Sequence, residues 1–458
     1  MGNFKAFLTI NRKEAGYRPV QERITDFGEV EQTLGEEDRI LQASRCMDCG
    51  VPFCHWSCPL GNKQPEWNDA IYKGDWRKAY ENLSSTDDFP EFTGRICPAL
   101  CEKGCVLNQE AQPVTIRENE VAIIEKAFTE GYVKPIIAAE KSGKKVAVIG
   151  SGPAGLACAN QLSQKGHDVV VYERDEAPGG LLRFGIPDFK LMKKIIDRRL
   201  DIMSVQGVKF VCSHKVSDDI STIAAEFDAV CIATGAGVAR NLMADGRELE
   251  GVHFALDFLK NQNRAVAARW VVDEGDALSA KDKKVLVIGG GDTGSDCVGT
   301  SIRQGAASVT QIEIMPKPPV GTNPATPWPY YPNILKTSSS HKEGCERRWS
   351  LATNRFIGKN GRLIGVEVKD TVTGEVEVIE ADMVLLAMGF VHTEHEGLVE
   401  SLGVELNERQ NINCDKTNLT SVSNVFVAGD ATLGASLVVR AIASGRNAAK
   451  NIDIFLKK

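Results

Sequence analysis

Apolar and polar positions divide the chain into a polar N-terminal stretch and two copies of one apolar pattern. Residues 146–149 and 285–288 are wholly apolar, and in both places a glycine-rich turn follows at once. A short apolar run bounded in this way is typical of a strand buried on both faces of a parallel sheet. The pattern predicts two βαβ units, which form a coarse internal repeat.

Two other stretches have different patterns. Residues 1–140 are polar, are interrupted by proline and glycine, and show helical periodicity at 69–82 and 121–129. Residues 316–341 are rich in proline, serine, threonine and aromatic residues, which predicts a long loop. Loops of this length are often functional, but composition assigns no chemistry to this one.

The first glycine-rich turn predicts a dinucleotide site. It reads Gly150-Ser151-Gly152-Pro153-Ala154-Gly155. Gly150 allows the tight turn, Gly152 lets the backbone approach a pyrophosphate, and Gly155 lets the helix pack closely on the strand. The pyrophosphate is expected at the helix N-terminus, where free N–H groups favour an anion. Glu173 ends the next apolar strand and is placed to accept a hydrogen bond from a ribose hydroxyl.

The second glycine-rich turn has the same context and predicts a second dinucleotide site. It reads Gly289-Gly290-Gly291-Asp292-Thr293-Gly294. Glu313 lies where Glu173 lies if the two following strands are matched residue for residue, which favours NADH. Lys317, just beyond, is placed to serve a 2′-phosphate. The choice between NADH and NADPH therefore stays open.

Composition and charge exclude several classes of protein. The chain has 458 residues, 43% of them hydrophobic, and a formal net charge of −7. We find no apolar run of 18 residues, no apolar N-terminal leader and no basic stretch. These features predict a soluble cytoplasmic protein with neither a membrane nor a nucleic acid as partner.

Seven of the thirteen cysteines are crowded into sixty residues. They are Cys46, Cys49, Cys54, Cys58, Cys97, Cys101 and Cys105. Thiolates bind zinc or iron–sulfur clusters, but structural zinc usually takes two short cysteine pairs, which this spacing does not give. The first four, with Pro59, resemble the run of bacterial ferredoxins, in which the fourth cysteine serves the other of two clusters. Two clusters need eight ligands, so either one ligand is not a cysteine or one cluster is incomplete.

Further motifs resemble the two-dinucleotide flavoprotein family that includes adrenodoxin reductase and thioredoxin reductase. They are Ala233-Thr234-Gly235, Ala387-Met388-Gly389 and Gly429-Asp430, each after an apolar strand. The resemblance implies that the first turn holds FAD, that Asp430 contacts the flavin, and that the nicotinamide domain is inserted into the FAD domain. Residues 179–187, which include Gly180 and Leu181, are expected along the isoalloxazine ring. Hydride passes directly from nicotinamide to flavin, so no catalytic acid or base is expected.

Nearly the whole chain resembles the small (β) subunit of glutamate synthase. The resemblance rests on the cysteine spacing, on residues 179–187, on Glu313-Ile314-Met315-Pro316-Lys317-Pro318-Pro319 and on residues 323–332. It implies an electron-input subunit that oxidises NADPH at FAD and passes electrons through two 4Fe–4S clusters. The acceptor is a large (α) subunit with FMN, which makes glutamate from glutamine and 2-oxoglutarate.

The resemblance also implies cluster ligands and a domain order. By the pattern of dihydropyrimidine dehydrogenase, one cluster takes Cys46, Cys49, Cys54 and Cys105, and the other takes Cys58, Cys97 and Cys101. The eighth ligand in that pattern is an amide, and the matching residue here is Glu120. The expected fold is α/β, with a helical iron–sulfur domain (1–140) before two Rossmann-like domains. The FAD domain spans 141–280 and 391–458, and the NAD(P)H domain (281–390) is inserted in it.

Two alternatives remain. A ferredoxin–NADP or sulfide dehydrogenase-type subunit would keep the redox chemistry and change the partner. A zinc-bound interaction module beside a flavin-only reductase would contain no iron.

Overall fold

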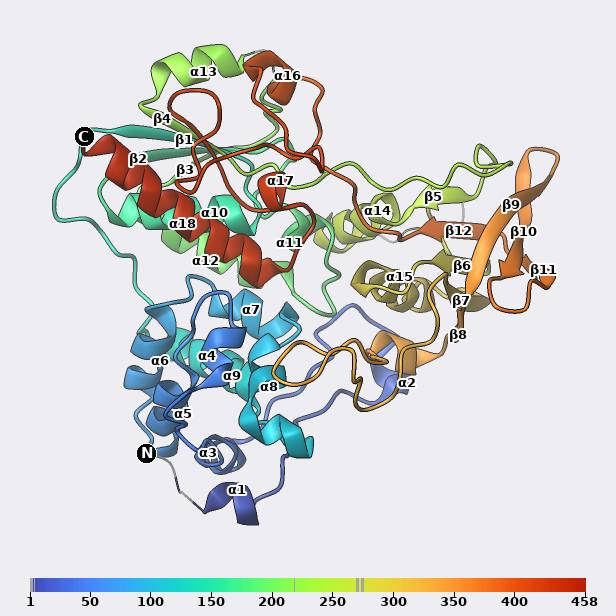
Figure 1. The fold of residues 1–458 in the computed structure, drawn as a ribbon, viewed down its shortest axis with the longest axis horizontal. Helices are drawn as coiled ribbons and strands as arrows, with labels where there is room; N and C mark the ends of the chain where they lie inside the picture. The colour runs from blue at the N-terminus through green and yellow to red at the C-terminus, as the bar shows by residue number, and fades with distance from the viewer. Residues whose placement is uncertain (1–2, 4, 218, 269–271, 273–275) are drawn as a thin grey trace.

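A helical region precedes the first sheet in the computed structural model, which describes residues 3, 5–217, 219–268, 272 and 276–458 (Figure 1). Its α-helices are α1 (Ala6–Thr9), α2 (Val20–Arg23), α3 (Glu36–Ser44), α4 (Phe53–Ser57), α5 (Gln64–Tyr72), α6 (Trp76–Ser84), α7 (Pro90–Ile96), α8 (Leu100–Gly104) and α9 (Ile116–Thr129). A 3-10 helix, η1 (Val106–Glu110), follows α8. Most of these helices are short, because glycine, proline and the cysteine-bearing turns interrupt them.

The first parallel sheet has the strand order β13-β4-β1-β2-β3. Its strands are β1 (Lys145–Ile149), β2 (Asp168–Tyr172), β3 (Lys209–Val211), β4 (Ala229–Ile232) and β13 (Val425–Val427). Alternate residues of β1 face opposite layers, as a doubly covered strand requires. One face packs on α10 (Pro153–Gln164), α12 (Lys193–Val205) and α18 (Val438–Leu456), and the other on α13 (Ile220–Glu226) and α16 (Leu398–Leu402) (Figure 1).

The second parallel sheet has the order β5-β12-β6-β7-β8. Its strands are β5 (Val252–Phe254), β6 (Lys284–Ile288), β7 (Ser308–Glu313), β8 (Glu346–Trp349) and β12 (Met383–Leu386). Helices α14 (Ala255–Ala268) and α15 (Asp292–Arg303) cover one face. The other face packs on an antiparallel sheet of β9 (Leu351–Lys359), β10 (Arg362–Asp370) and β11 (Val376–Glu380), which the sequence analysis did not predict.

These sheets confirm the predicted fold class, in which one α/β unit is inserted in another behind a helical region. The insertion follows from β13, which returns to the first sheet after the second sheet is complete. The four domain ranges stay a prediction. Strand β5 already belongs to the second sheet, although it precedes residue 281.

The helical region shares its core with the first sheet. Phe89 and Phe92, beside and within α7, are fully buried in the same apolar cluster as β1 and α10. Glu91 of α7 also accepts from Arg199 of α12, at 2.6 Å between Oε1 and Nε. Burial of this ion pair and of the two rings makes the helical region part of one packed body.

A buried charge cluster joins the helical region to the second sheet. The Glu343 carboxylate, in the 3-10 helix η2 (Ser340–Glu343), accepts from Arg23 Nε at 2.6 Å and from Arg303 Nη1 at 2.6 Å. All three side chains are at most 3% exposed. Nearby, the Val30 amide donates to the Phe189 carbonyl, at 3.0 Å. The segment before α3 therefore contacts both α/β units.

Among the described residues, we find no helix with the length and apolar composition needed to cross a bilayer.

We expect Glu343→Gln to lower the free energy of unfolding by about 3–5 kcal/mol, because it leaves two buried guanidinium groups without a carboxylate. Urea denaturation followed by tryptophan fluorescence measures this loss. The control is Glu375→Gln at an exposed turn, for which we expect a change of less than about 0.5 kcal/mol. Equal stability of the two variants would show that the cluster does not hold the parts together.

Candidate functional site

A cavity of about 690 Å³ lies where the two parallel sheets meet. Ten of the fifteen residues predicted to bind the dinucleotides line it. They are Gly150, Gly152, Pro153, Ala154, Glu173, Gly180, Leu181, Asp292, Thr293 and Asp430. The first seven of these surround the N-terminus of α10, whereas Asp292 and Thr293 begin α15. One cavity thus contains residues of both glycine-rich turns.

The other five predicted residues are glycines that do not line the cavity: Gly155, Gly289, Gly291, Gly294 and Gly429. A Cβ at Gly155 would lie 2.0 Å from the Gly150 carbonyl oxygen, and one at Gly294 would lie 2.3 Å from the Gly289 oxygen. These two glycines therefore let each helix pack against its own turn.

Two of the glycines leave open space beside the backbone. A Cβ built on Gly152 or Gly291 meets nothing within 4 Å. Each residue directly precedes a helix, α10 or α15, whose first N–H groups are free of intrahelical partners. The space and the free donors fit a pyrophosphate in both turns.

The two strand-end glutamates make equivalent contacts. Glu173 Oε2 accepts from the Ser151 amide at 3.1 Å, and Glu313 Oε2 accepts from the Gly290 amide at 2.7 Å. Ser151 and Gly290 each occupy the second position of their turn. Glu313 therefore stands in the second unit where Glu173 stands in the first, as the residue-for-residue match predicted.

Two cations lie beside the end of β7. Lys317 Nζ and the Arg347 guanidinium carbon are each 5.0 Å from the centroid of the Trp349 ring. Trp349 pairs with Glu313 across the sheet, so both cations lie near the strand-end carboxylate. Arg347 had no signal in the sequence, because β8 follows β7 only after the long loop.

Asp430 enters the cavity at the start of α17 (Asp430–Leu433). Burial raises the pKa of its carboxyl, against hydrogen bonds from Ser436. The preceding residue, Gly429, has φ +70, and a Cβ there would lie 2.6 Å from the Ala154 Cβ. The close approach explains why glycine precedes the aspartate.

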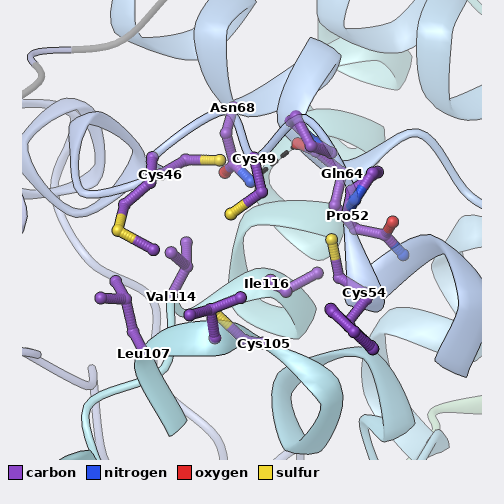
Figure 2. A pocket seen from close by; sticks show the side chains of 14 residues that line it. Cys46, Cys49, Pro52, Cys54, Gln64, Asn68, Cys105, Leu107, Val114 and Ile116 are labelled. Atoms are coloured by element: carbon purple, nitrogen blue, oxygen red, sulfur yellow. Dashed lines mark hydrogen bonds between the residues drawn. The ribbon is translucent and has the colours of Figure 1, made fainter. Parts of the chain in front are cut away.

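Four cysteines surround one pocket in the helical region (Figure 2). We call Cys46, Cys49, Cys54 and Cys105 the first cysteine set. The other lining residues are mostly apolar, among them Phe53, Leu107, Val114 and Ile116. Burial raises the pKa of the Cys46 thiol to about 12, so these sulfurs need a cation to become thiolates.

The remaining three cysteines gather around Glu120. Cys58, Cys97 and Cys101 each interact electrostatically with this carboxylate, and with it they form what we call the second cysteine set. Glu120 is 5% exposed and accepts from Thr93 Oγ1. Burial, and then the nearby Asp87 carboxylate, raise its pKa well above the usual range. An exposed helix glutamate would show none of this.

Each set supplies four donors of the kind that iron–sulfur clusters take: sulfur with, in one set, a single oxygen. Among the described residues, no three histidine, cysteine or acidic side chains lie close enough together to hold one metal ion. The first set instead lines the walls of a shared pocket.

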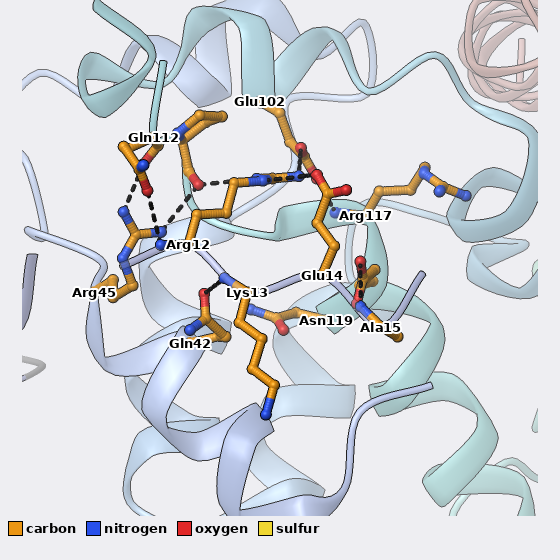
Figure 3. Close-up of polar contacts among 12 residues, drawn as sticks. Arg12, Lys13, Glu14, Ala15, Gln42, Arg45, Glu102, Gln112, Arg117 and Asn119 are labelled. Atoms are coloured by element: carbon orange, nitrogen blue, oxygen red, sulfur yellow. Dashed lines mark hydrogen bonds and ion pairs between the residues drawn. The ribbon is translucent and has the colours of Figure 1, made fainter. Parts of the chain in front are cut away.

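A polar network fixes the segments that carry the first cysteine set (Figure 3). Arg45, directly before Cys46, donates to the Gln112 carbonyl at 2.7 Å. Arg12 donates to the Glu102 carboxylate at 2.8 Å and, through its backbone amide, to the Gln112 side chain at 2.7 Å. The network ties the start of the cysteine region to its end, which brings Cys46 and Cys105 to one pocket.

The long loop also contacts the first cysteine set. Trp328 Nε1 donates to the carbonyls of Gly104 and Cys105, at 3.3 and 3.2 Å. Its ring lies 4.7 Å from the Phe53 ring, centroid to centroid. The loop thus reaches from the second sheet to the helical region, which its composition did not indicate.

Comparison with protein families gives two matches. Residues 144–445 match the family "Pyridine nucleotide-disulphide oxidoreductase". Residues 23–132 match "Dihydropyrimidine dehydrogenase domain II, 4Fe-4S cluster". The first range contains both glycine-rich turns, and the second contains all seven clustered cysteines and Glu120.

Individual proteins agree with these families. The chain is 50% identical to the glutamate synthase [NADPH] small chain of Mycobacterium tuberculosis, over 97% of this chain and 94% of the relative. It is 39% identical to glutamate synthase [NADH] of Schizosaccharomyces pombe, over 99% of this chain and 23% of that longer protein. The structure of Mycobacterium tuberculosis FprA in complex with NADPH shares the fold, with a TM-score of 0.52 and 17% identity over 69% of this chain and 84% of that one. With its cavity, its cysteine sets and these relatives, the chain belongs to the glutamate synthase small-chain family.

Proposed function

We propose that the chain is the electron-input subunit of a glutamate synthase. It oxidises NADPH at FAD and passes the electrons through two 4Fe–4S clusters to an FMN-containing large subunit, which makes glutamate from glutamine and 2-oxoglutarate. A cavity lined by both glycine-rich turns, together with two cysteine sets in the same chain, carries this proposal. The position of Tyr331 indicates that the two are close together. Its hydroxyl interacts electrostatically with Asp292, which lines the cavity, and with Cys97 of the second cysteine set. The cavity and the cysteines are therefore neighbours.

The residues of the cavity bind and orient the dinucleotides. Gly150 and Gly152 give a pyrophosphate access to the N-terminus of α10, and Glu173 is oriented by its backbone contacts to accept from a ribose hydroxyl. FAD, when bound, accepts a hydride from the nicotinamide and gives up electrons singly. The side chains contribute position and electrostatics, so we assign none of them as a catalytic acid or base.

The two cysteine sets supply the cluster ligands in this proposal. The first set gives four thiolates, and the second gives three thiolates and the Glu120 carboxylate. The shared pocket supports the first assignment, and the burial of Glu120 among three cysteines supports the second. Glu120 thus takes the place of the amide ligand in the related pattern.

NADPH is the donor in this proposal. Lys317 and Arg347 place two positive charges near the strand-end carboxylate, where a 2′-phosphate would otherwise meet only Glu313. The small chain of Mycobacterium tuberculosis, 50% identical to this chain, is named for NADPH. These cations favour NADPH over the NADH that Glu313 alone suggests.

A large subunit is the partner in this proposal. The name of the relative from Mycobacterium tuberculosis is that of a small chain. In the Schizosaccharomyces pombe relative, the similar sequence is part of a much longer glutamate synthase. We place the complex in the cytoplasm, where free thiols persist for cluster assembly.

NADPH oxidation by the chain, purified anaerobically with the large chain that accompanies it, tests this function. We expect oxidation to need both glutamine and 2-oxoglutarate, and to be faster with NADPH than with NADH. If iron is present and NADPH oxidation does not depend on glutamine or 2-oxoglutarate, a ferredoxin–NADP or sulfide dehydrogenase-type subunit is favoured. A yellow protein with zinc and no iron would favour the interaction module.

We expect Gly152→Ala to fold normally and to lose FAD. Its φ of −64 suits alanine, and its new methyl group projects into the space assigned to the pyrophosphate. Overpacking of this kind costs about 1–3 kcal/mol, or roughly 5- to 150-fold in affinity. Flavin absorbance after dialysis measures the loss, and Gly35→Ala, also in open space, is the control. Full flavin retention would place the pyrophosphate elsewhere.

Glu120→Ala should halve the iron and acid-labile sulfide per flavin, because it removes one ligand of one cluster. Iron analysis and EPR of the reduced protein measure this outcome. The matched variant is Glu110→Ala at an exposed position, which should retain all its iron. If Glu120→Ala also keeps its full iron content, Glu120 is not a ligand.

A further inference from the structure

Gln64 is a buried polar residue without a partner for its side chain. It is the first residue of α5 and is 1% exposed. Both Nε2 and Oε1 are buried and have no hydrogen-bond partner among the described residues. The residue lines the pocket of the first cysteine set (Figure 2).

The backbone of Gln64 is held in place by buried amides. Asn68 Nδ2 donates to the Gln64 carbonyl at 2.8 Å, and Asn119 Nδ2 donates to Asn68 Oδ1 at 2.8 Å. Arg39 in turn donates to Asn119 Oδ1 at 3.3 Å. This chain fixes the start of α5 beside the pocket, and the Gln64 amide makes no hydrogen bond to Asn68.

The pocket itself offers the Gln64 amide few acceptors. Apart from Gln64 and Asn68, the side chains that line it are apolar or are cysteine or methionine. A buried donor left without an acceptor is unfavourable. The side-chain acceptors that remain for Nε2 along this pocket are therefore sulfurs.

We propose that Gln64 Nε2 donates a hydrogen bond to a sulfur of the cluster in the first cysteine set and thereby raises its reduction potential. The inference rests on the proposed function for the presence of that cluster. Reduction adds an electron to the cluster, and an N–H dipole aimed at a sulfur stabilises the added negative charge. The amide nitrogen is the group that faces the cluster, since a cluster accepts hydrogen bonds and does not donate them.

A potentiometric titration of the holoprotein, followed by EPR, tests the role of this positioning residue. Gln64→Met keeps the approximate shape of the side chain and removes the donor. We expect the ratio of reduced to oxidised cluster at a fixed potential to fall about tenfold, which is about 59 mV for one electron. The cluster in the second cysteine set should keep its potential, and it provides an internal reference.

Trp67→Phe is the matched control. Trp67 lies on the same helix, is fully buried, and has an Nε1 without a partner among the described residues, but it does not line the pocket. We expect its substitution to leave both potentials unchanged. An unchanged potential in Gln64→Met, with full iron content, would overturn the inference and leave the function intact. A wild-type protein without iron would overturn the function first.

A second measurement decides the matter if Gln64→Met fails to assemble its cluster. Wild-type protein labelled with 15N in the glutamine side-chain amide is reduced and studied by pulsed EPR. We expect a 15N coupling at one of the two clusters, transmitted through the hydrogen bond. The absence of any such coupling would overturn the inference.

Discussion

One carboxylate shared by two buried guanidinium groups holds the parts of this molecule together. Glu343 belongs to the second α/β unit, as does Arg303, whereas Arg23 precedes the first cysteine by about twenty residues. None of the three side chains can leave without stranding a buried charge. The helical region is fixed by this cluster on one side and by the shared core of Phe89 and Phe92 on the other. The distance between the cavity and the cysteine sets is therefore set by the fold.

A fixed separation between the cavity and the cysteine sets suits the proposed chemistry, which needs no side chain as a catalytic acid or base. The cavity is lined by residues of both turns, and Tyr331 interacts electrostatically with Asp292 in it and with Cys97 of the second cysteine set. The first set lies under the long loop, whose Trp328 donates to the Cys105 carbonyl. Electron transfer between such sites depends on their separation and on the local electrostatics. The rigid contacts fix the separation, and burial and hydrogen bonds to sulfur set the electrostatics.

The local motifs could be predicted from the sequence, because a turn at a strand end or a run of cysteines is a short-range pattern. The three-stranded antiparallel sheet was missed, although Asn360-Gly361, both with positive φ, is a typical hairpin turn. The contacts of Trp328 and the isolation of Gln64 had no such signal. Both depend on which distant segments meet in the folded chain, and a local pattern does not reveal that. The equivalence of Glu173 and Glu313 was visible because both follow the same local pattern.

The return of β13 to the first sheet imposes an order on how the protein is made. All seven clustered cysteines and Glu120 are synthesised before the first strand of either sheet. The cavity, by contrast, needs Asp430 and residues up to Ala441, which come after the whole second sheet. The cluster ligands are therefore available while most of the chain has still to be translated. The flavin site is complete only when translation is nearly finished.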